Sequence, residues 1–217
     1  MISLLLFKRI IIFILSILVF AFIVGTVPGL VYYNSHPLYY KELIGEYSKA
    51  NELDPYMVSA IIKVESRYNK DAISPKDARG LMQIGEQTGE WGAKELEIND
   101  YNSQTLFDPE KNIRIGTWYL SKLRKEFGDR NDIILAAYNG GSGNVSKWLN
   151  NKEHSKDGTA LENIPFKETR EYVKKVNKNY ETYKKIYKDT NFEDGSFNSI
   201  YIDYIYNILN YFKDASN

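Results

Sequence analysis

Glu65 is the residue whose position in the sequence first indicates chemistry. It follows Ile61 by four residues and Val58 by seven, so it continues the apolar stripe of a predicted helix. Burial raises the pKa of a carboxyl, and a carboxyl that stays protonated near neutral pH can act as a general acid. The same position also fits a frayed helix end at which Glu65 caps the helix or pairs with Lys63 or Arg67.

Glu65 also opens a series of short motifs that run through most of the chain. The series reads Glu65-Ser66, Ala72 and Ser74, Gly80-Leu81-Met82-Gln83, Asn112-Ile113 with Gly116 and Tyr119-Leu120, Ala136-Ala137-Tyr138-Asn139-Gly140-Gly141, and Ile164-Pro165-Phe166-Lys167-Glu168-Thr169-Arg170-Glu171-Tyr172-Val173. In this order the motifs closely resemble the catalytic core of the soluble lytic transglycosylases, glycoside hydrolase family 23, which share a lysozyme-like fold with goose-type lysozyme. Any one motif alone is a weak signal, and their common order from about Leu38 to Tyr187 carries the resemblance.

The resemblance implies an enzyme that cleaves the β-1,4 bond between N-acetylmuramic acid and N-acetylglucosamine in peptidoglycan. Glu65 would act first as general acid and then as base, and the products would carry 1,6-anhydromuramoyl ends. The N-acetyl group of the substrate would replace the second carboxylate that most glycosidases use. No cofactor and no metal are expected, because His36 and His154 are isolated from other potential ligands.

The resemblance and the residue chemistry together give four candidate substrate-binding residues in the central motifs. Tyr138 and Asn139 precede a glycine-rich bend, where they could hydrogen-bond a sugar hydroxyl or N-acetyl group, or where Asn139 could stabilise the turn. Met82 could pack on a sugar face or belong to the core. Gln83 is expected to line the cleft and form hydrogen bonds.

Three further candidates come from the first and last motifs. Ser66 and Ser74 could bond Glu65 or the substrate, or could cap a helix end and a loop. Glu168 resembles a family glutamate near the cleft, or serves as a favourable charge at a helix N-terminus. The tryptophans, which fit the core and a sugar platform equally well, are Trp91, Trp118 and Trp148.

Four residues depart from the family pattern. Lys70 and Glu86 stand where proline is common, Asp77 where glycine is common, and Gly140 where alanine is usual. Asp77 and Glu86 are interpreted either as solvated loop charges or as a second carboxylate that holds a water opposite Glu65. A water held in this way would make the protein a hydrolytic muramidase.

Two other classes of function also remain open. One is a wall-binding scaffold that has kept the fold and lost catalysis, which the intact Glu65 argues against. The other is a wall-opening component of an envelope-spanning secretion or conjugation apparatus, with envelope partners that the sequence does not identify.

The N-terminal region predicts a membrane helix. No charged residue occurs between Ile10 and Ser35, and about 20 apolar residues suffice to span a hydrocarbon core. Lys8 and Arg9 precede the run and Tyr32 and Tyr33 end it, which favours a cytoplasmic N-terminus and an interfacial aromatic belt. We expect a single-pass cell-membrane protein with an extracytoplasmic catalytic domain, although a cleaved signal peptide and a secreted form are the competing reading.

Composition excludes several classes of function. Without Lys8 and Arg9 the chain has 26 basic against 28 acidic residues, and a nearly neutral body argues against binding of nucleic acid. The chain has no cysteine, which excludes disulfides, thiolate metal sites and a cysteine nucleophile.

Helical periodicity with little strand signal predicts an all-α, lysozyme-like domain behind one transmembrane helix. The expected divisions are a cytoplasmic N-terminus (1–9), an anchor (10–33), the transglycosylase domain (34–188) and an amphipathic C-terminal extension (189–217). Asp54-Pro55 and Asp108-Pro109 predict helix starts, and Asn131 predicts a cap. A first helix is expected over 38–51 and a last one over 167–188, with Tyr172 on its inner face.

Overall fold

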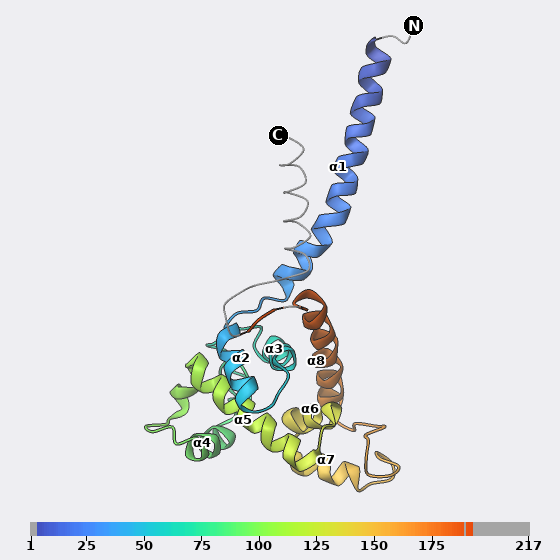
Figure 1. The fold of residues 1–217 in the computed structure, drawn as a ribbon. Coiled ribbons are helices and arrows are strands. Elements are labelled where there is room, and N and C mark those ends of the chain that lie inside the picture. Colours follow the sequence, from blue (N-terminus) through green and yellow to red (C-terminus); the bar gives the residue numbers. More distant parts are fainter. Residues whose placement is uncertain (1–3, 189, 193–217) are drawn as a thin grey trace.

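The computed structural model describes residues 4–188 and 190–192, and within these ranges it contains helices and two isolated β-bridges but no extended strand. The elements are α1 (Leu4–Ser35), α2 (Lys41–Ala50), α3 (Pro55–Glu65), α4 (Glu86–Glu95), the 3-10 helix η1 (Ser103–Phe107), α5 (Pro109–Phe127), α6 (Asn131–Gly140), α7 (Ser142–Leu149) and α8 (Lys167–Ile186), as Figure 1 shows. The predicted all-α class is confirmed.

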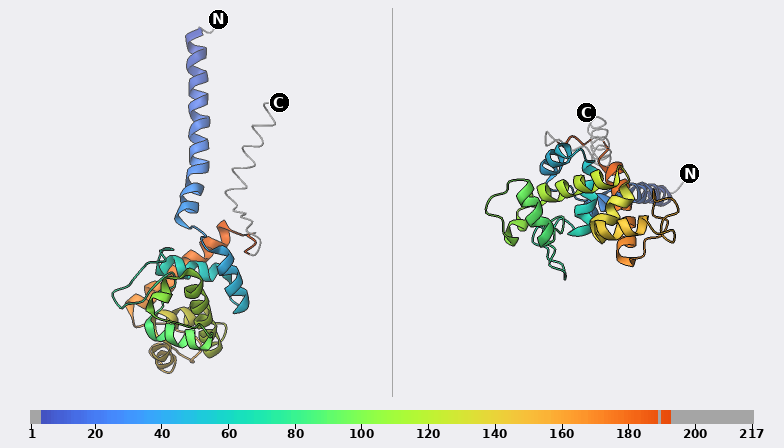
Figure 2. Two further views of the ribbon diagram at one scale, coloured as in Figure 1. Left: turned by 90° about the vertical axis from the view of Figure 1, so that its left-hand side faces the viewer. Right: turned by 90° about the horizontal axis from the view of Figure 1, so that it is seen from below.

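Helix α1 projects away from the other helices (Figures 1 and 2). Its segment Leu6–Val27 is 22 residues long and apolar enough to cross a membrane. Large side chains along it, such as Phe13 and Phe20, are exposed. An apolar helix that is largely uncovered by protein is typical of a membrane anchor or a signal segment.

The segment after α1 is attached to the C-terminal half of α8. The Tyr183 hydroxyl donates to the Pro37 carbonyl (2.8 Å), and the Tyr187 hydroxyl donates to the His36 carbonyl (2.7 Å). His36 Nε2 also lies 3.0 Å from Asn179 Oδ1. The apolar helix therefore leaves the domain at a fixed point rather than through a free linker.

Helix α3 is the centre of the core and packs chiefly against α8 (Figure 1). Its apolar residues Val58, Ile61 and Ile62 are fully buried, and Val176 and Tyr183 of α8 are buried as completely. Complete burial of an aliphatic side chain contributes about 1.5–3 kcal/mol relative to exposure. The core therefore fixes the axis of α3, and with it the position of the residue at its end.

Two predicted helix starts are confirmed. Asp54 caps α3 and Asp108 caps α5, each followed by proline, and Gly128 ends α5. The predicted cap at Asn131 is wrong, because Asn131 is already the first residue of α6 and Arg130 precedes it without a side-chain cap.

Other boundaries shift by a few residues. Helix α2 begins at Lys41 rather than at residue 38, because Tyr40 adopts a left-handed conformation with φ of 58°. Helix α8 ends at Ile186 rather than at residue 188. Helices α4 and α7 were not predicted, because α4 contains two glycines and few apolar residues and α7 is only 8 residues long. Apart from residues 190–192, the predicted amphipathic extension (189–217) lies outside what the structure describes, as do the Tyr32 and Tyr33 side chains.

Candidate active site

Glu65 is the last residue of α3. The Ser66 amide closes the helix on the Ile62 carbonyl (3.0 Å). Arg67 and Tyr68 then adopt left-handed conformations, with φ of 52° and 65°, so the chain turns away at once. The carboxyl is therefore held at the end of a buried helix and is not carried out into solvent by a further helical turn.

The surroundings of the Glu65 carboxyl favour its protonated form. Burial is the main cause that raises its pKa from 4.5 to about 7, and the negative charge of Glu168 acts in the same direction. An interaction with the Tyr172 hydroxyl opposes this rise. No ion pair joins Glu65 to Lys63 or Arg67 in the described part of the chain. The pairing alternative is therefore not adopted, and the apolar position has the effect expected from the sequence.

Glu65 opens into a cavity of about 360 Å³ between the end of α3, the loop before α4, the end of α6 and the start of α8. We call this cavity the cleft. Its lining residues are Glu65, Ser74, Pro75, Lys76, Ala78, Gln83, Tyr138, Asn139 and Glu168. Five of the seven predicted substrate-binding residues are thus brought together around Glu65.

Ser74 and Gln83 line the cleft and also shape the loop that forms one of its walls. Ser74 Oγ accepts from the amides of Lys76 (3.2 Å) and Ala78 (3.0 Å). Gln83 Nε2 donates to the carbonyls of Ala72 (3.1 Å) and Gly80 (3.0 Å). Both side chains therefore fix the wall at the point where a ligand would meet it.

Asn112 of α5 holds this loop through side-chain hydrogen bonds. Its side chain is fully buried, accepts from the Met82 amide (2.8 Å) and donates to the carbonyls of Arg79 (3.0 Å) and Leu106 (2.8 Å). Gly80 has φ of 74°, and a Cβ there would lie 2.3 Å from Asn112 Nδ2. Sequence reasoning identified Asn112 as a motif residue but not as a positioning residue of the site.

Met82 and Ser66 do not lie in the cleft, contrary to the prediction. The Met82 side chain is fully buried, and Gly116 makes room for it, since a Cβ at that glycine would lie 2.3 Å from the Met82 sulfur. Ser66 is also buried, and its hydroxyl donates to the Ile62 carbonyl (3.2 Å). Met82 therefore belongs to the core and Ser66 caps its helix, which were the alternative interpretations of both residues.

Tyr138 and Asn139 end α6 at the cleft. The Tyr138 hydroxyl donates to the Met82 carbonyl (2.8 Å), and burial raises the pKa of this phenol well above its usual value, helped by the charge of Glu65. The phenol is thus neutral, and its oxygen can still accept a hydrogen bond. Asn139 makes no side-chain hydrogen bond within the described part of the chain, which leaves its amide available to a ligand.

Glu168 is the second carboxylate of the cleft. It lies in the first turn of α8, where the helix dipole favours an acidic residue, and it pairs with Lys76 across the opening (3.4 Å). Asp77 and Glu86 do not line the cleft: Asp77 pairs with Arg79 (3.0 Å), and Glu86 begins α4. The two carboxylates that sequence analysis singled out as possible water holders are therefore not those beside Glu65.

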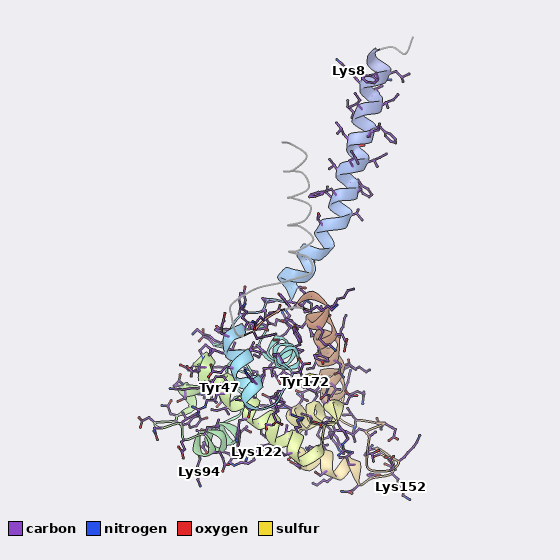
Figure 3. The ribbon with its side chains drawn as sticks, viewed as in Figure 1. Lys8, Tyr47, Lys94, Lys122, Lys152 and Tyr172 are labelled. Carbon is purple, nitrogen blue, oxygen red and sulfur yellow. The ribbon has the colours of Figure 1, made fainter. Side chains whose placement is uncertain are left out.

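Tyr172 is the residue at the site that sequence reasoning assigned only to the core. Figure 3 shows it on α8, beside α3. Its hydroxyl is buried and makes no hydrogen bond of good geometry to a described residue, although it interacts with the Glu65 carboxyl. Burial and the charge of Glu65 raise the pKa of the phenol well above its usual value. The sequence signal that could have placed Tyr172 at the site is its position on the inner face of the last helix.

The fold and the cleft are those of a lysozyme-like helical domain, with a largely buried carboxyl at the end of its central helix. Residues 42–160 match the family model described as the transglycosylase SLT domain, and the chain belongs to this family. The family resemblance carried by the motifs is thereby confirmed.

Curated relatives match this region within longer chains. The soluble lytic murein transglycosylase of Escherichia coli (strain K12) is 42% identical over 142 residues, which cover 64% of this chain and 22% of the relative. The membrane-bound lytic murein transglycosylase C of Edwardsiella ictaluri (strain 93-146) is 30% identical over 175 residues, covering 68% and 47%. The crystal structure of the 70 kDa soluble lytic transglycosylase from Escherichia coli matches with a TM-score of 0.63 and 34% identity, covering 75% of this chain and 28% of that one.

The match therefore spans between about a fifth and about half of the length of these curated relatives.

Proposed function

We propose that this protein is a peptidoglycan lytic transglycosylase that cleaves the β-1,4 bond between N-acetylmuramic acid and N-acetylglucosamine. The observation that carries the proposal is the Glu65 carboxyl, whose pKa is raised to about 7 and which opens into a cleft lined by hydrogen-bonding groups. The relatives named lytic murein transglycosylases support the choice of substrate.

In the first step Glu65 is a general acid. Its proton passes to the glycosidic oxygen, and the bond from that oxygen to the anomeric carbon of N-acetylmuramic acid breaks. The substrate's own N-acetyl group stabilises the positive charge that develops at that carbon. The interaction with Tyr172 stabilises the carboxylate that Glu65 has become.

In the second step Glu65 is a general base. It takes the proton of the muramic C6 hydroxyl, whose oxygen bonds to the anomeric carbon and closes the 1,6-anhydro ring. Glu65 is again protonated at the end, and no water is consumed. A pKa of about 7 suits both steps, because one group must donate and accept a proton at the same pH.

A hydrolytic muramidase is the alternative with a structural basis, because Glu168 lines the same cleft as Glu65. A carboxylate that activates water must face the anomeric carbon opposite the acid. Glu168 is instead exposed and paired with Lys76 at the opening of the cleft, which favours the water-free reaction.

The apolar helix supports an extracytoplasmic site of action, where peptidoglycan lies. We propose that Leu6–Val27 anchors the protein in the cytoplasmic membrane with the helical domain outside. The hydrogen bonds that tie His36 and Pro37 to α8 then hold the cleft at a set distance from the membrane.

Digestion of peptidoglycan in water enriched in ¹⁸O tests the reaction. Mass spectrometry of the products should show 1,6-anhydromuramoyl ends, each one water lighter than a reducing end and free of the label. Labelled reducing ends would establish the muramidase instead. The Glu65→Gln protein is the blank for contaminating enzymes, and undiminished cleavage by it would overturn the assignment of the acid.

A further inference from the structure

Trp91 is exposed, whereas the other two tryptophans are buried. Its exposed fraction is 47%, against 7% for both Trp118 and Trp148. Isolated exposed apolar side chains are common on soluble domains and need no explanation by themselves. Trp91 is different because aromatic contacts connect it to the cleft.

Three rings from three helices form a continuous path from the cleft to the surface. Tyr138 of α6 lines the cleft, and its ring centre lies 5.6 Å from that of Tyr119 on α5. The Tyr119 ring in turn lies 6.5 Å from that of Trp91 on α4, at an interplanar angle of 73°. We call Tyr138, Tyr119 and Trp91 the aromatic row.

The indole of Trp91 is held in place before any ligand arrives. It meets Trp118 edge to face, with ring centres 4.7 Å apart, and Lys122 Nζ lies 5.9 Å from the Trp91 centre and 5.3 Å from the Trp118 centre. Lys122 also pairs with Glu95 (3.3 Å), and Figure 3 places it beside α4. A ring fixed in this way loses little side-chain entropy when it binds a ligand.

The surface around Trp91 combines an apolar plate with charged hydrogen-bonding groups. A pyranose ring has the matching character, since its C–H faces are apolar and its hydroxyls lie around the edge. Lys122 can donate to such hydroxyls, and Glu95 can accept from them. A flat apolar protein partner would bury this ion pair without offering it any hydrogen-bonding group.

We propose that the aromatic row is a glycan-binding surface that continues the cleft past the bond that is cut, with Trp91 as the outer platform for an uncharged sugar ring. The inference rests on the proposed function for the identity of the natural glycan. It adds that Trp91 contributes only when the strand is long enough to reach it.

Binding to uncharged N-acetylglucosamine oligomers of increasing length tests the proposal without requiring cleavage. The full-length Glu65→Gln protein in detergent is titrated while tryptophan fluorescence is recorded. We expect a spectral change that grows with oligomer length and is absent when Trp91→Phe is added. Calorimetry should show that Trp91→Ala weakens binding of the longest oligomers about tenfold and leaves the shortest unchanged.

The matched control is Tyr39→Ala, which removes another exposed aromatic ring far from the row in sequence. Trp91→Phe keeps a ring and should retain most of the affinity, which separates stacking from a general loss of fold. In the active protein, Trp91→Ala should raise KM for long peptidoglycan strands and leave kcat nearly unchanged.

Equal affinities of the Trp91→Ala and Tyr39→Ala proteins for every oligomer would overturn the proposal, as would capture of a protein through Trp91 with no effect on glycan. Failure of the proposed function has a different signature: the wild-type protein would release no anhydromuramoyl product while length-dependent binding at Trp91 persisted.

Discussion

Each end of α3 borders a cavity that is lined partly by acidic residues. The hydrogen bonds and ion pairs of those residues differ between the two ends. At the N-terminal end a cavity of about 200 Å³ is lined by apolar residues such as Met57 and Ile134 and by the acidic residues Asp54 and Asp129. Asp54 accepts from the Tyr56 amide (2.8 Å) and the Tyr180 hydroxyl (2.7 Å). At the C-terminal end Glu65 borders the cleft and forms no salt bridge with a described residue.

The difference shows that a cavity and a carboxylate do not by themselves make an acid catalyst. Asp129 is paired with Arg124, and Asp54 is used to start the helix. Among Asp54, Asp129 and Glu65, Glu65 is the one that is largely buried and forms no salt bridge with a described residue, and burial is the main cause that raises its pKa to about 7. A substitution of Glu65 can therefore be compared with a substitution of Asp54 at the other end of the same helix to test the proposed mechanism.

The largest expected effect is on the rate of cleavage. Glu65→Gln removes the group that donates the proton in the first step and accepts the proton in the second, and kcat should fall at least about 10³-fold. Asp54→Asn keeps a good helix cap, because asparagine and aspartate cap equally well, and kcat should change less than about twofold. The measurement is release of muropeptides from purified peptidoglycan, with circular dichroism to verify that both variants are folded. Comparable losses in both would mean that Glu65 acts through the fold.

The next effect is on stability. The folded-state pKa of Glu65 lies above its ordinary value of 4.5, so the wild-type protein has its full stability at low pH and loses part of it as pH rises through about 7. Glu65→Gln has no such loss. It should match the wild type near pH 4 and exceed it by about 3 kcal/mol above pH 8, in denaturant unfolding of the two proteins. An equal difference at both pH values would indicate a change in packing instead.

Local sequence signals predicted much of the fold and part of the site. Proline after an aspartate located the starts of α3 and α5. A glutamate on an apolar stripe, together with the family motifs, indicated the carboxyl that we propose as the acid. The roles of residues that depend on contacts distant in the sequence were harder to predict. Met82 reads equally well as a cleft or a core residue until Gly116, far along the chain, is seen to make room for it.

Tyr172 illustrates the same limit from the other side. Its spacing predicts a core position, which is where it lies. That its hydroxyl interacts with Glu65 depends on how α8 packs against α3, and no local pattern contains that information. The predicted role of Glu168 near the cleft came from the family motif, whereas its pairing with Lys76 became known only from the fold.

The Tyr172 hydroxyl provides a smaller test at the C-terminal end of α3. Because its interaction lowers the pKa of Glu65, Tyr172→Phe should move the alkaline limb of the pH–kcat profile to higher pH. Maximal kcat should fall, since the ionised form of Glu65 between the two steps loses a stabilising partner. Stability should change by less than about 1 kcal/mol, because the hydroxyl makes no good hydrogen bond. A limb that moves to lower pH would contradict the assigned interaction.

The smallest expected effect is that of Glu168, whose charge raises the pKa of Glu65 from the opening of the cleft. Glu168→Gln should move the alkaline limb to lower pH, opposite to Tyr172→Phe. The matched control is Glu171→Gln on the same helix, whose carboxylate lies 3.7 Å from Lys174 and is not among the groups that shift the pKa of Glu65.

Salt separates this long-range effect of Glu168 from a direct role in the reaction. Glu168 is exposed, so its influence on Glu65 is screened and the shift should disappear in ~1 M salt. A base that activates water would behave otherwise, because kcat would collapse in Glu168→Gln at every pH and salt concentration. The salt dependence of one variant thus distinguishes a charge that tunes Glu65 from a second catalytic carboxylate.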